Sequence, residues 1–199
     1  IDAFYIRIHG HPGNDKLTSI RTINPDVPCI WEINAPLEEM LTSGIDKDKL
    51  ELYNKKRKDY ALLVDAAVCV SQEMAEYAKD TLKIQNVFVV PNGSDPSFFN
   101  PEKKNKKVFN TQKFIVIWAG SPKYTWQGAK IIESVAKKMM GIDDSILFVL
   151  TAEGNSTDNI QYLGNVDYID ISKYLASADV GLCIYEPVTF YKEFFFSPL

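Results

Sequence analysis

The chain has 199 residues, of which 46% are hydrophobic and 24% are charged, and its formal net charge is −4. This balance is typical of a globular protein and argues against a general nucleic-acid binder, which needs a basic surface. No apolar run is long enough to span a bilayer, and Ile1 opens into a strand-like pattern without a basic leader. We therefore expect a cytoplasmic protein whose sequence is cut short upstream of Ile1.

Short apolar runs rich in β-branched and aromatic residues predict strands along the whole chain. In chain order these runs are 3–8, 29–33, 66–70, 87–90, 114–119, 146–150 and 180–185. Most are apolar almost throughout rather than alternating, which is typical of parallel strands covered on both faces.

Three helices are predicted between these strands. Asp46 is an N-cap candidate for a helix reaching about residue 63, and Ser71 is one for a helix reaching about residue 82. A third helix, 128–140, carries an apolar stripe at helical spacing. The stripe consists of Ile131, Ile132, Val135, Ala136 and Met139. Strands that alternate with helices predict a parallel α/β fold.

The alternation is interrupted at 91–107, where three prolines and an Asn-Gly turn precede a basic run. We interpret this as a boundary between two α/β domains, 1–92 and 108–199, joined by a linker at 93–107. The lysines of the linker are interpreted as solvated. The KKRK run at 55–58 is interpreted as a solvated helix face, with contact to an anionic membrane surface as the alternative.

The three cysteines, Cys29, Cys69 and Cys183, lie in apolar stretches, and no two of them have the spacing of metal ligands. We expect buried free thiols, which indicate a reducing compartment. His9 and His11 form a His-x-His pair without a third ligand nearby in sequence, so a metal site is not expected.

Four segments together resemble the GT-B glycosyltransferases of the GT4 type (glycosyl transferases group 1). They are VCVSQEMAEY at 68–77, VFVVPNGSDPSFFNP at 87–101, IVIWAGSPKYTWQG at 115–128 and IQYLGNVDYIDISKYLASADVGLCIYE at 160–186. The resemblance spans about residues 28–199. It implies two Rossmann-like domains, an acceptor-side domain followed by a nucleotide-sugar-binding domain, both incomplete in this chain because the family enzymes are about twice as long.

The resemblance implies a retaining transferase that moves a sugar from a nucleoside diphosphate sugar, such as a UDP- or GDP-sugar, to an acceptor hydroxyl. The acceptor implied is a carbohydrate or a lipid-linked sugar, as in polysaccharide biosynthesis, with peripheral membrane contact as a further expectation. No metal or other cofactor is implied, because GT-B enzymes generally stabilise the leaving diphosphate with protein groups.

The loop at 120–127 is the first predicted part of the donor site. The backbone at Gly120 and Ser121 can approach phosphates closely, and Lys123 can supply positive charge. The sequence departs from the family here, because Gln127 stands where the family's "KG" motif has lysine.

Two later segments complete the predicted donor site. Gly164 and Asn165 match the family segment whose backbone contacts the nucleotide base. Ser197, Pro198 and Leu199 match an "SPLK" turn that offers backbone amides to the diphosphate. In the family a glutamate-bearing helix follows this turn, so we expect the chain to be cut short at its end as well.

The strand at 29–33 carries the catalytic candidates. Many relatives have a histidine at its end, where Asn34 stands here, and Glu32 precedes it by two residues on the same face. Both side chains suit hydrogen bonding to sugar hydroxyls at the carboxyl edge of a sheet. Arg7 and His9 are further cleft candidates. The alternative for Glu32 is a structural ion pair with Arg7.

Three other functions stay open on the sequence alone. A nucleotide-sugar 2-epimerase shares the double-Rossmann architecture but needs acid and base carboxylates around the sugar. A non-catalytic nucleotide- or sugar-binding homologue is suggested by Gln127 and Asn34, both of which replace chemically active residues. A periplasmic-type sugar-binding protein would need a signal peptide.

Overall fold

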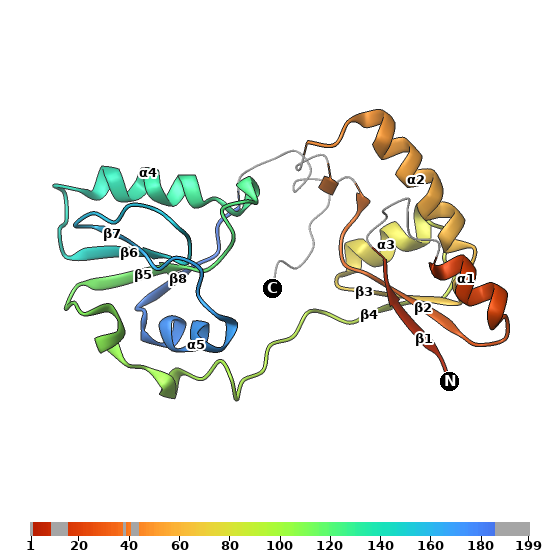
Figure 1. Ribbon diagram of the computed structural model, residues 1–199, viewed down its shortest axis with the longest axis horizontal. Helices are drawn as coiled ribbons and strands as arrows, with labels where there is room; N and C mark the ends of the chain where they lie inside the picture. The colour runs from red at the N-terminus through yellow and green to blue at the C-terminus, as the bar shows by residue number, and fades with distance from the viewer. Residues whose placement is uncertain (1, 9–15, 38, 41–43, 186–199) are drawn as a thin grey trace. The chain divides into compact units, whose positions relative to one another are not determined.

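The computed structural model describes residues 2–8, 16–37, 39–40 and 44–185. These residues form two compact α/β units that divide between Gly93 and Ser94. Each unit contains one four-stranded sheet in which every neighbouring pair of strands is parallel (Figure 1). The predicted fold class, α/β with two Rossmann-like domains, is confirmed.

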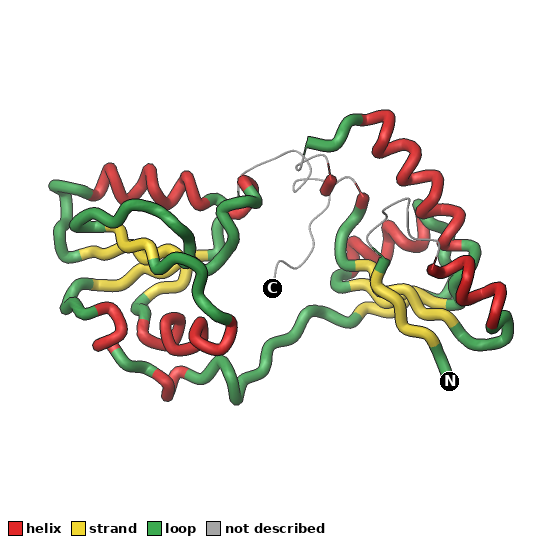
Figure 2. Tube along the Cα trace, in the orientation of Figure 1, coloured by secondary structure: helices red, strands yellow, loops and turns green. Residues whose placement is uncertain are grey.

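The first unit alternates strands and helices. Its elements are β1 (Phe4–Arg7), α1 (Lys16–Ile23), β2 (Cys29–Ile33), α2 (Lys47–Ala61), β3 (Ala66–Cys69), α3 (Gln72–Asp80) and β4 (Val87–Val89). The strand order is β1-β2-β3-β4, so each strand lies beside the next in sequence. Each crossover connection in this unit leads to the next strand in the same direction across the sheet. Because such connections are right-handed, their helices all pack on one side, and α1, α2 and α3 cover the same face (Figures 1 and 2).

The core of the first unit lies between this face of the sheet and the helices. Trp31 and Ile33 of β2 and Ala67 and Cys69 of β3 are fully buried there, together with Met74 of α3. Burial of an aliphatic or aromatic side chain of this kind stabilises a fold by about 1.5–3 kcal/mol. The helix side of the sheet therefore supplies most of the apolar burial in this unit.

The opposite face of the first sheet is largely open to solvent. Tyr5 of β1 and Phe88 of β4 are 58% and 59% exposed, and burial alternates along the strands. The near-continuous apolar runs predicted coverage on both faces, and for the described part of this unit that prediction is wrong. The reason is topological, since no crossover among the described elements returns on this side.

The predicted N-caps are confirmed. The Asp46 carboxylate accepts a hydrogen bond from the Lys49 amide (2.8 Å) at the start of α2. The Ser71 hydroxyl accepts one from the Met74 amide (3.2 Å) at the start of α3. Each cap satisfies an amide that the first helical turn would otherwise leave unpaired.

The interpretation of the KKRK run as a solvated helix face is wrong for Arg57, which is buried. Its side chain is 4% exposed, and its guanidinium carbon lies 5.2 Å from the ring centroid of Trp31 and 5.4 Å from that of Tyr77. Its Nη2 atom donates to the carbonyl oxygen of Ala35 (2.8 Å). Position 57 lies four residues after buried Tyr53, so it falls on the buried stripe of α2, whereas Lys55 and Lys58 are exposed.

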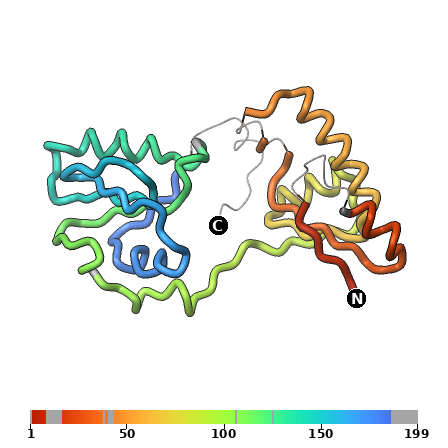
Figure 3. Tube along the Cα trace, in the orientation of Figure 1, coloured from red at the N-terminus to blue at the C-terminus, as the bar shows by residue number. Residues whose placement is uncertain are grey.

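The second unit is wound on both faces of its sheet. Its main elements are β5 (Phe114–Trp118), α4 (Ala129–Met139), β6 (Ile146–Leu150), β7 (Ile160–Tyr162), α5 (Tyr168–Ser177) and β8 (Val180–Leu182). Short 3-10 helices occur at Pro101–Lys103, Lys106–Phe109 and Thr125–Gln127. The strand order is β7-β6-β5-β8, and α4 and α5 lie on opposite faces (Figures 1 and 3).

Two apolar clusters sandwich this second sheet. Trp118, Phe148 and Leu150 pack with Ile132 of α4 on one face. On the other face a second cluster packs with α5, and it includes Phe109, Ile115, Ile117, Leu147 and Val149. Coverage on both faces, predicted from the apolar runs, is confirmed for this sheet.

Several local predictions need correction. Helices α1 and α5 and strand β7 were not predicted, because their sequences are short and weakly patterned. Cys29 and Cys69 are buried, as expected, but Cys183 is exposed because it follows the edge strand β8. Val135 of the predicted apolar stripe is exposed as well.

Tyr162 generates a prediction about alkaline stability. Its hydroxyl donates to Glu133 Oε1 (2.8 Å), and burial followed by this hydrogen bond and charge raises its pKa to about 12. The unfolded chain releases the Tyr162 hydroxyl proton near pH 10. The stabilisation of the folded state by this protonated hydroxyl is therefore fully present below pH 10 and is lost as the pH rises toward 12. In urea unfolding across this range, Tyr162→Phe should lose less stability than the wild type. Parallel losses in the two proteins would contradict the assignment.

Candidate functional site

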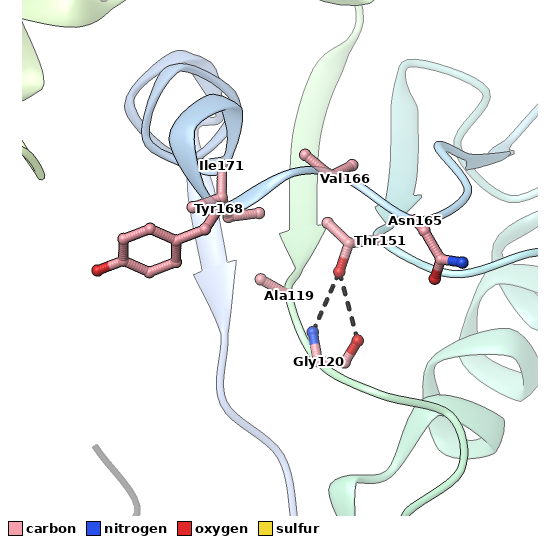
Figure 4. Close-up of a pocket in the computed structure, with 7 residues that line it drawn as sticks. All are labelled: Ala119, Gly120, Thr151, Asn165, Val166, Tyr168 and Ile171. Carbon is pink, nitrogen blue, oxygen red and sulfur yellow. Dashed lines mark hydrogen bonds between the residues drawn. The ribbon is translucent and has the colours of Figure 1, made fainter.

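A pocket of about 290 Å³ lies at the carboxyl edge of the second sheet. Ala119 and Gly120 follow the end of β5, and Thr151 follows the end of β6. The rest of the lining comes from the β7–α5 connection and from α5, namely Asn165, Val166, Tyr168 and Ile171 (Figure 4). In open α/β sheets ligands bind at this edge, beside the point where crossovers leave to opposite faces.

Hydrogen bonds donated by backbone amides hold together the strand ends that line the pocket. The Gly120 amide donates to Thr151 Oγ1 (3.1 Å), and the Thr151 amide donates to the carbonyl oxygen of Trp118 (3.1 Å). The Gly164 amide donates to the carbonyl oxygen of Ala152 (2.9 Å), and Gly164 has a φ of +71°. That turn favours glycine and leads the chain into the pocket wall at Asn165.

The pocket walls combine apolar and polar groups. Ala119, Val166 and Ile171 supply an apolar lining, and Thr151 and Asn165 supply a hydroxyl and a carboxamide. In Figure 4 the Tyr168 ring and the Asn165 amide lie on opposite sides of the Gly120–Thr151 pair. A few polar groups on an apolar surface are typical of sites for small organic ligands.

The start of α5 adds negative charge beside the pocket. Asp167 is the N-cap residue, and its carboxylate makes no capping hydrogen bond. Asp170 lies in the first turn, where it pairs with Lys173 (2.9 Å). Carboxylates repel phosphate oxygens and accept hydrogen bonds from hydroxyl groups, so this pocket suits the neutral part of a ligand better than its phosphates.

Tyr168 connects the pocket wall to the segment that opens the second unit. Its ring stacks on Phe98, with a centroid distance of 5.0 Å and an interplanar angle of 7°. Phe98 is held in turn by Lys103, whose Nζ donates to the Phe98 carbonyl oxygen (2.6 Å) and lies 4.5 Å from its ring centroid. This stack holds the Tyr168 ring against the segment that opens the second unit.

The loop between β5 and α4 is closed by its own hydrogen bonds. The Ser121 amide donates to Gln127 Oε1 (2.7 Å), and the Gln127 amide donates to the Tyr124 carbonyl oxygen (3.0 Å). The amides of Gly120 and Ser121, predicted to face a diphosphate, thus both have internal acceptors. Lys123 lies exposed in the same loop.

The catalytic candidates of the first unit lie at the carboxyl edge of its own sheet. Glu32 lies opposite Arg7 in the strand register, and their Oε1 and Nε atoms are 3.8 Å apart. Tyr5 also hydrogen-bonds to Glu32, and partial burial followed by this carboxylate raises the pKa of Tyr5. Asn34 follows β2, and its buried Oδ1 atom has no hydrogen-bond partner among the described residues.

Four predicted site residues, His9, Ser197, Pro198 and Leu199, lie outside the described residues. Within the described ranges, no three His, Cys, Asp or Glu side chains gather into a group that could hold a metal ion. Among those same residues, no helix has the length and apolar character needed to cross a membrane.

Sequence reasoning missed five residues of the pocket lining. Thr151 gave a usable signal, because it is a polar residue directly after the buried run ILFVL, at the end where parallel sheets bind ligands. The other four give no such signal, because an ordinary alanine, valine, tyrosine or isoleucine becomes a pocket wall only through folding. They are Ala119, Val166, Tyr168 and Ile171.

Comparisons with known proteins give a structural match only. No known protein family matches the sequence, and no curated protein matches it. The structure is similar to the crystal structure of a glycosyltransferase from Rickettsia africae ESF-5, with a TM-score of 0.47 and 15% sequence identity. The match covers 83% of this chain and 53% of that one, so the chain spans about half of the matched protein.

Gly120 generates a prediction about stability. A Cβ atom at this position would lie 2.5 Å from the ring of Trp118 and 2.6 Å from Gln127 Oε1. Trp118 is 2% exposed, and its Nε1 atom donates to the Gln127 carbonyl oxygen (3.0 Å), so it cannot move aside easily. Gly120→Ala should therefore lose about 1–3 kcal/mol in urea unfolding. The control Gly181→Ala meets open space and should lose little; equal losses would contradict this packing.

Glu32 generates a second prediction, which tests its alternative role as a structural partner. Arg7 and Glu32 are 55% and 23% exposed, and solvent-exposed ion pairs contribute little. Glu32→Gln should change the free energy of unfolding by less than about 1 kcal/mol. Exposed Glu51 of α2 provides the matched control, Glu51→Gln. A much larger loss for Glu32→Gln would assign this residue to holding the fold.

Proposed function

We propose that this chain is part of a retaining glycosyltransferase that moves a sugar from a nucleoside diphosphate sugar, such as a UDP- or GDP-sugar, to an acceptor hydroxyl. The observation that carries the proposal is the pocket at the carboxyl edge of the second sheet. Apart from Thr151, its lining comes from the loop after β5 and the segment after β7, which lie in two of the segments whose sequences resemble the GT4-type donor site.

In this proposal the pocket takes the nucleoside. The apolar lining around Val166 and Ile171 covers the faces of the base, and the Asn165 carboxamide hydrogen-bonds to its edge. The Asp167 carboxylate is available as an acceptor for ribose hydroxyls, because it makes no capping hydrogen bond. The negative charge of Asp167, which has no cation paired with it among the described residues, directs the diphosphate away from α5, toward the 120–127 loop.

The proposed chemistry depends on stabilising the leaving diphosphate. Negative charge develops on it as the bond to the anomeric carbon breaks, and oriented cations or amides lower that barrier. We assign Lys123 to this role, with the backbone amides of Ser197 and Leu199 as further donors, Pro198 shaping the turn between them, and no metal ion. On the acceptor side we assign Glu32 and Asn34 to sugar hydroxyls, with Arg7 and His9 as supporting cleft residues. The acceptor is a carbohydrate or lipid-linked sugar.

A second candidate is a non-catalytic homologue that binds a nucleotide or sugar. One observation favours it, namely the hydrogen bond of the Ser121 amide to Gln127 (2.7 Å). Gln127 stands where the resembling family has a lysine, so this loop has lost a cation and engages one of its own amides. A protein that retains a nucleoside without transferring sugar needs neither group.

A thermal-shift titration of the full-length protein that contains this chain with UDP, GDP, ADP and their common sugar conjugates tests the proposal, because we expect the 199-residue chain alone to be inactive. A ligand that binds only the native state raises the melting temperature, so one nucleotide base should raise it selectively. Asn165→Ala should reduce that shift, whereas the control Asn155→Ala, in the exposed β6–β7 loop, should leave it unchanged. No shift with any nucleotide would overturn the proposal.

Incubation of the responsive nucleotide sugar with the protein then separates the two candidates. A transferase releases the nucleoside diphosphate by transfer or slow hydrolysis, and Glu32→Gln should lower that release while leaving the melting temperature unchanged. A binding homologue retains the nucleotide sugar intact.

A further inference from the structure

The Gly120–Ser121 turn is occupied by an atom of the chain itself. The Ser121 amide donates to Gln127 Oε1 at 2.7 Å, at the short end of the range for neutral N–H···O bonds. The same oxygen packs directly over Gly120, where an added Cβ atom would lie 2.6 Å from it. The carboxamide oxygen therefore lies in the concavity of this turn, against the one residue without a side chain.

Gln127 is held in place for this contact by its own backbone. It ends the 3-10 helix Thr125–Gln127, its amide donates to the Tyr124 carbonyl oxygen (3.0 Å), and its carbonyl oxygen accepts from Trp118 Nε1 (3.0 Å). Trp118 is itself part of the apolar core under α4. The carboxamide is thus presented to Ser121 by a rigid support rather than by a free side chain.

We propose that Gln127 determines which ligands the loop accepts, because its carbonyl oxygen holds the position on the Ser121 amide that a phosphate oxygen would take. The inference rests on the proposed function, since it assumes a donor that carries a diphosphate. A diphosphate binds to this amide only after the Gln127 carboxamide has turned away.

The exchange is chemically reasonable because a phosphate oxygen is a stronger acceptor than a neutral carboxamide oxygen. A glutamine side chain also carries two N–H donors, so after turning it can donate to the phosphate that displaced it. Gln127 is therefore a positioning residue in the free protein and a specificity determinant toward anions. Ligands without phosphates do not need the exchange.

Two substitutions should change anion binding in opposite directions. Gln127→Met has similar length and no oxygen, so it leaves the Ser121 amide available. Gln127→Glu keeps an acceptor on that amide and adds a negative charge that repels the ligand. Because one net hydrogen bond is at stake, each change should amount to about two- to tenfold in affinity. Gln112→Glu, at an exposed position before β5, controls for charge alone.

The probe is inorganic pyrophosphate, titrated by calorimetry, with amide hydrogen exchange of Ser121 measured in the ligand-free protein. Gln127→Met should bind pyrophosphate more tightly and exchange the Ser121 amide faster, and Gln127→Glu should bind it more weakly. If Gln127→Met does not fold, Gln127→Asn serves instead. Asparagine keeps a side-chain carboxamide, but its side chain is shorter and does not reach the Ser121 backbone amide.

The inference is overturned if freeing the Ser121 amide leaves pyrophosphate affinity unchanged or lower, or if its exchange does not respond to Gln127→Met. Failure of the proposed function looks different. In that case no nucleotide shifts the melting temperature, while the affinity for pyrophosphate still rises with Gln127→Met and falls with Gln127→Glu. If the proposed function holds, the nucleoside that carries the selected base, which lacks phosphates, should bind the wild type and both variants equally.

Discussion

The pairing of β5 with both β6 and β8 is the constraint on which the second unit depends. Every strand of this sheet runs parallel, so all the carboxyl ends meet at one edge. The chain leaves β5 for α4 on one face of the sheet and leaves β7 for α5 on the other face. The loops that follow these two strands therefore turn to opposite sides and leave room between them at the edge. Gly120, Thr151 and Asn165 are far apart in the sequence, and this arrangement alone brings them to one pocket.

Charge divides this edge into two regions with different chemistry. The carboxylate of Asp167 lies at the start of α5 beside the pocket, whereas Lys123 lies in the loop between β5 and α4. A ligand with one neutral end and one anionic end fits such a division, because Coulomb repulsion keeps its phosphates away from α5. In our proposal, the side chain of Gln127 decides how readily the loop receives the anionic end.

The first unit places its polar groups under a different constraint. All its described helices cover one face of the sheet, so Trp31 and Ile33 are buried while Glu32, between them in sequence, points to the open side. Arg57 shows the same effect in reverse, because its place on the buried stripe of α2 carries a cation into contact with two aromatic rings. A buried guanidinium is tolerated there because it stacks on aromatic faces and donates to the Ala35 carbonyl oxygen.

The sequence by itself determined the α/β class, seven of the eight strands among the described residues, and the caps at Asp46 and Ser71, because hydrophobic runs and capping side chains act locally. It also pointed to Gly120, Ser121 and Gln127. Only the tertiary structure decided that Gln127 bonds to Ser121, that Thr151 joins the pocket, and that Arg57 is buried while Cys183 is exposed. Those outcomes depend on strand order and on the side of the sheet to which each crossover returns. Neither is encoded in any single stretch of residues.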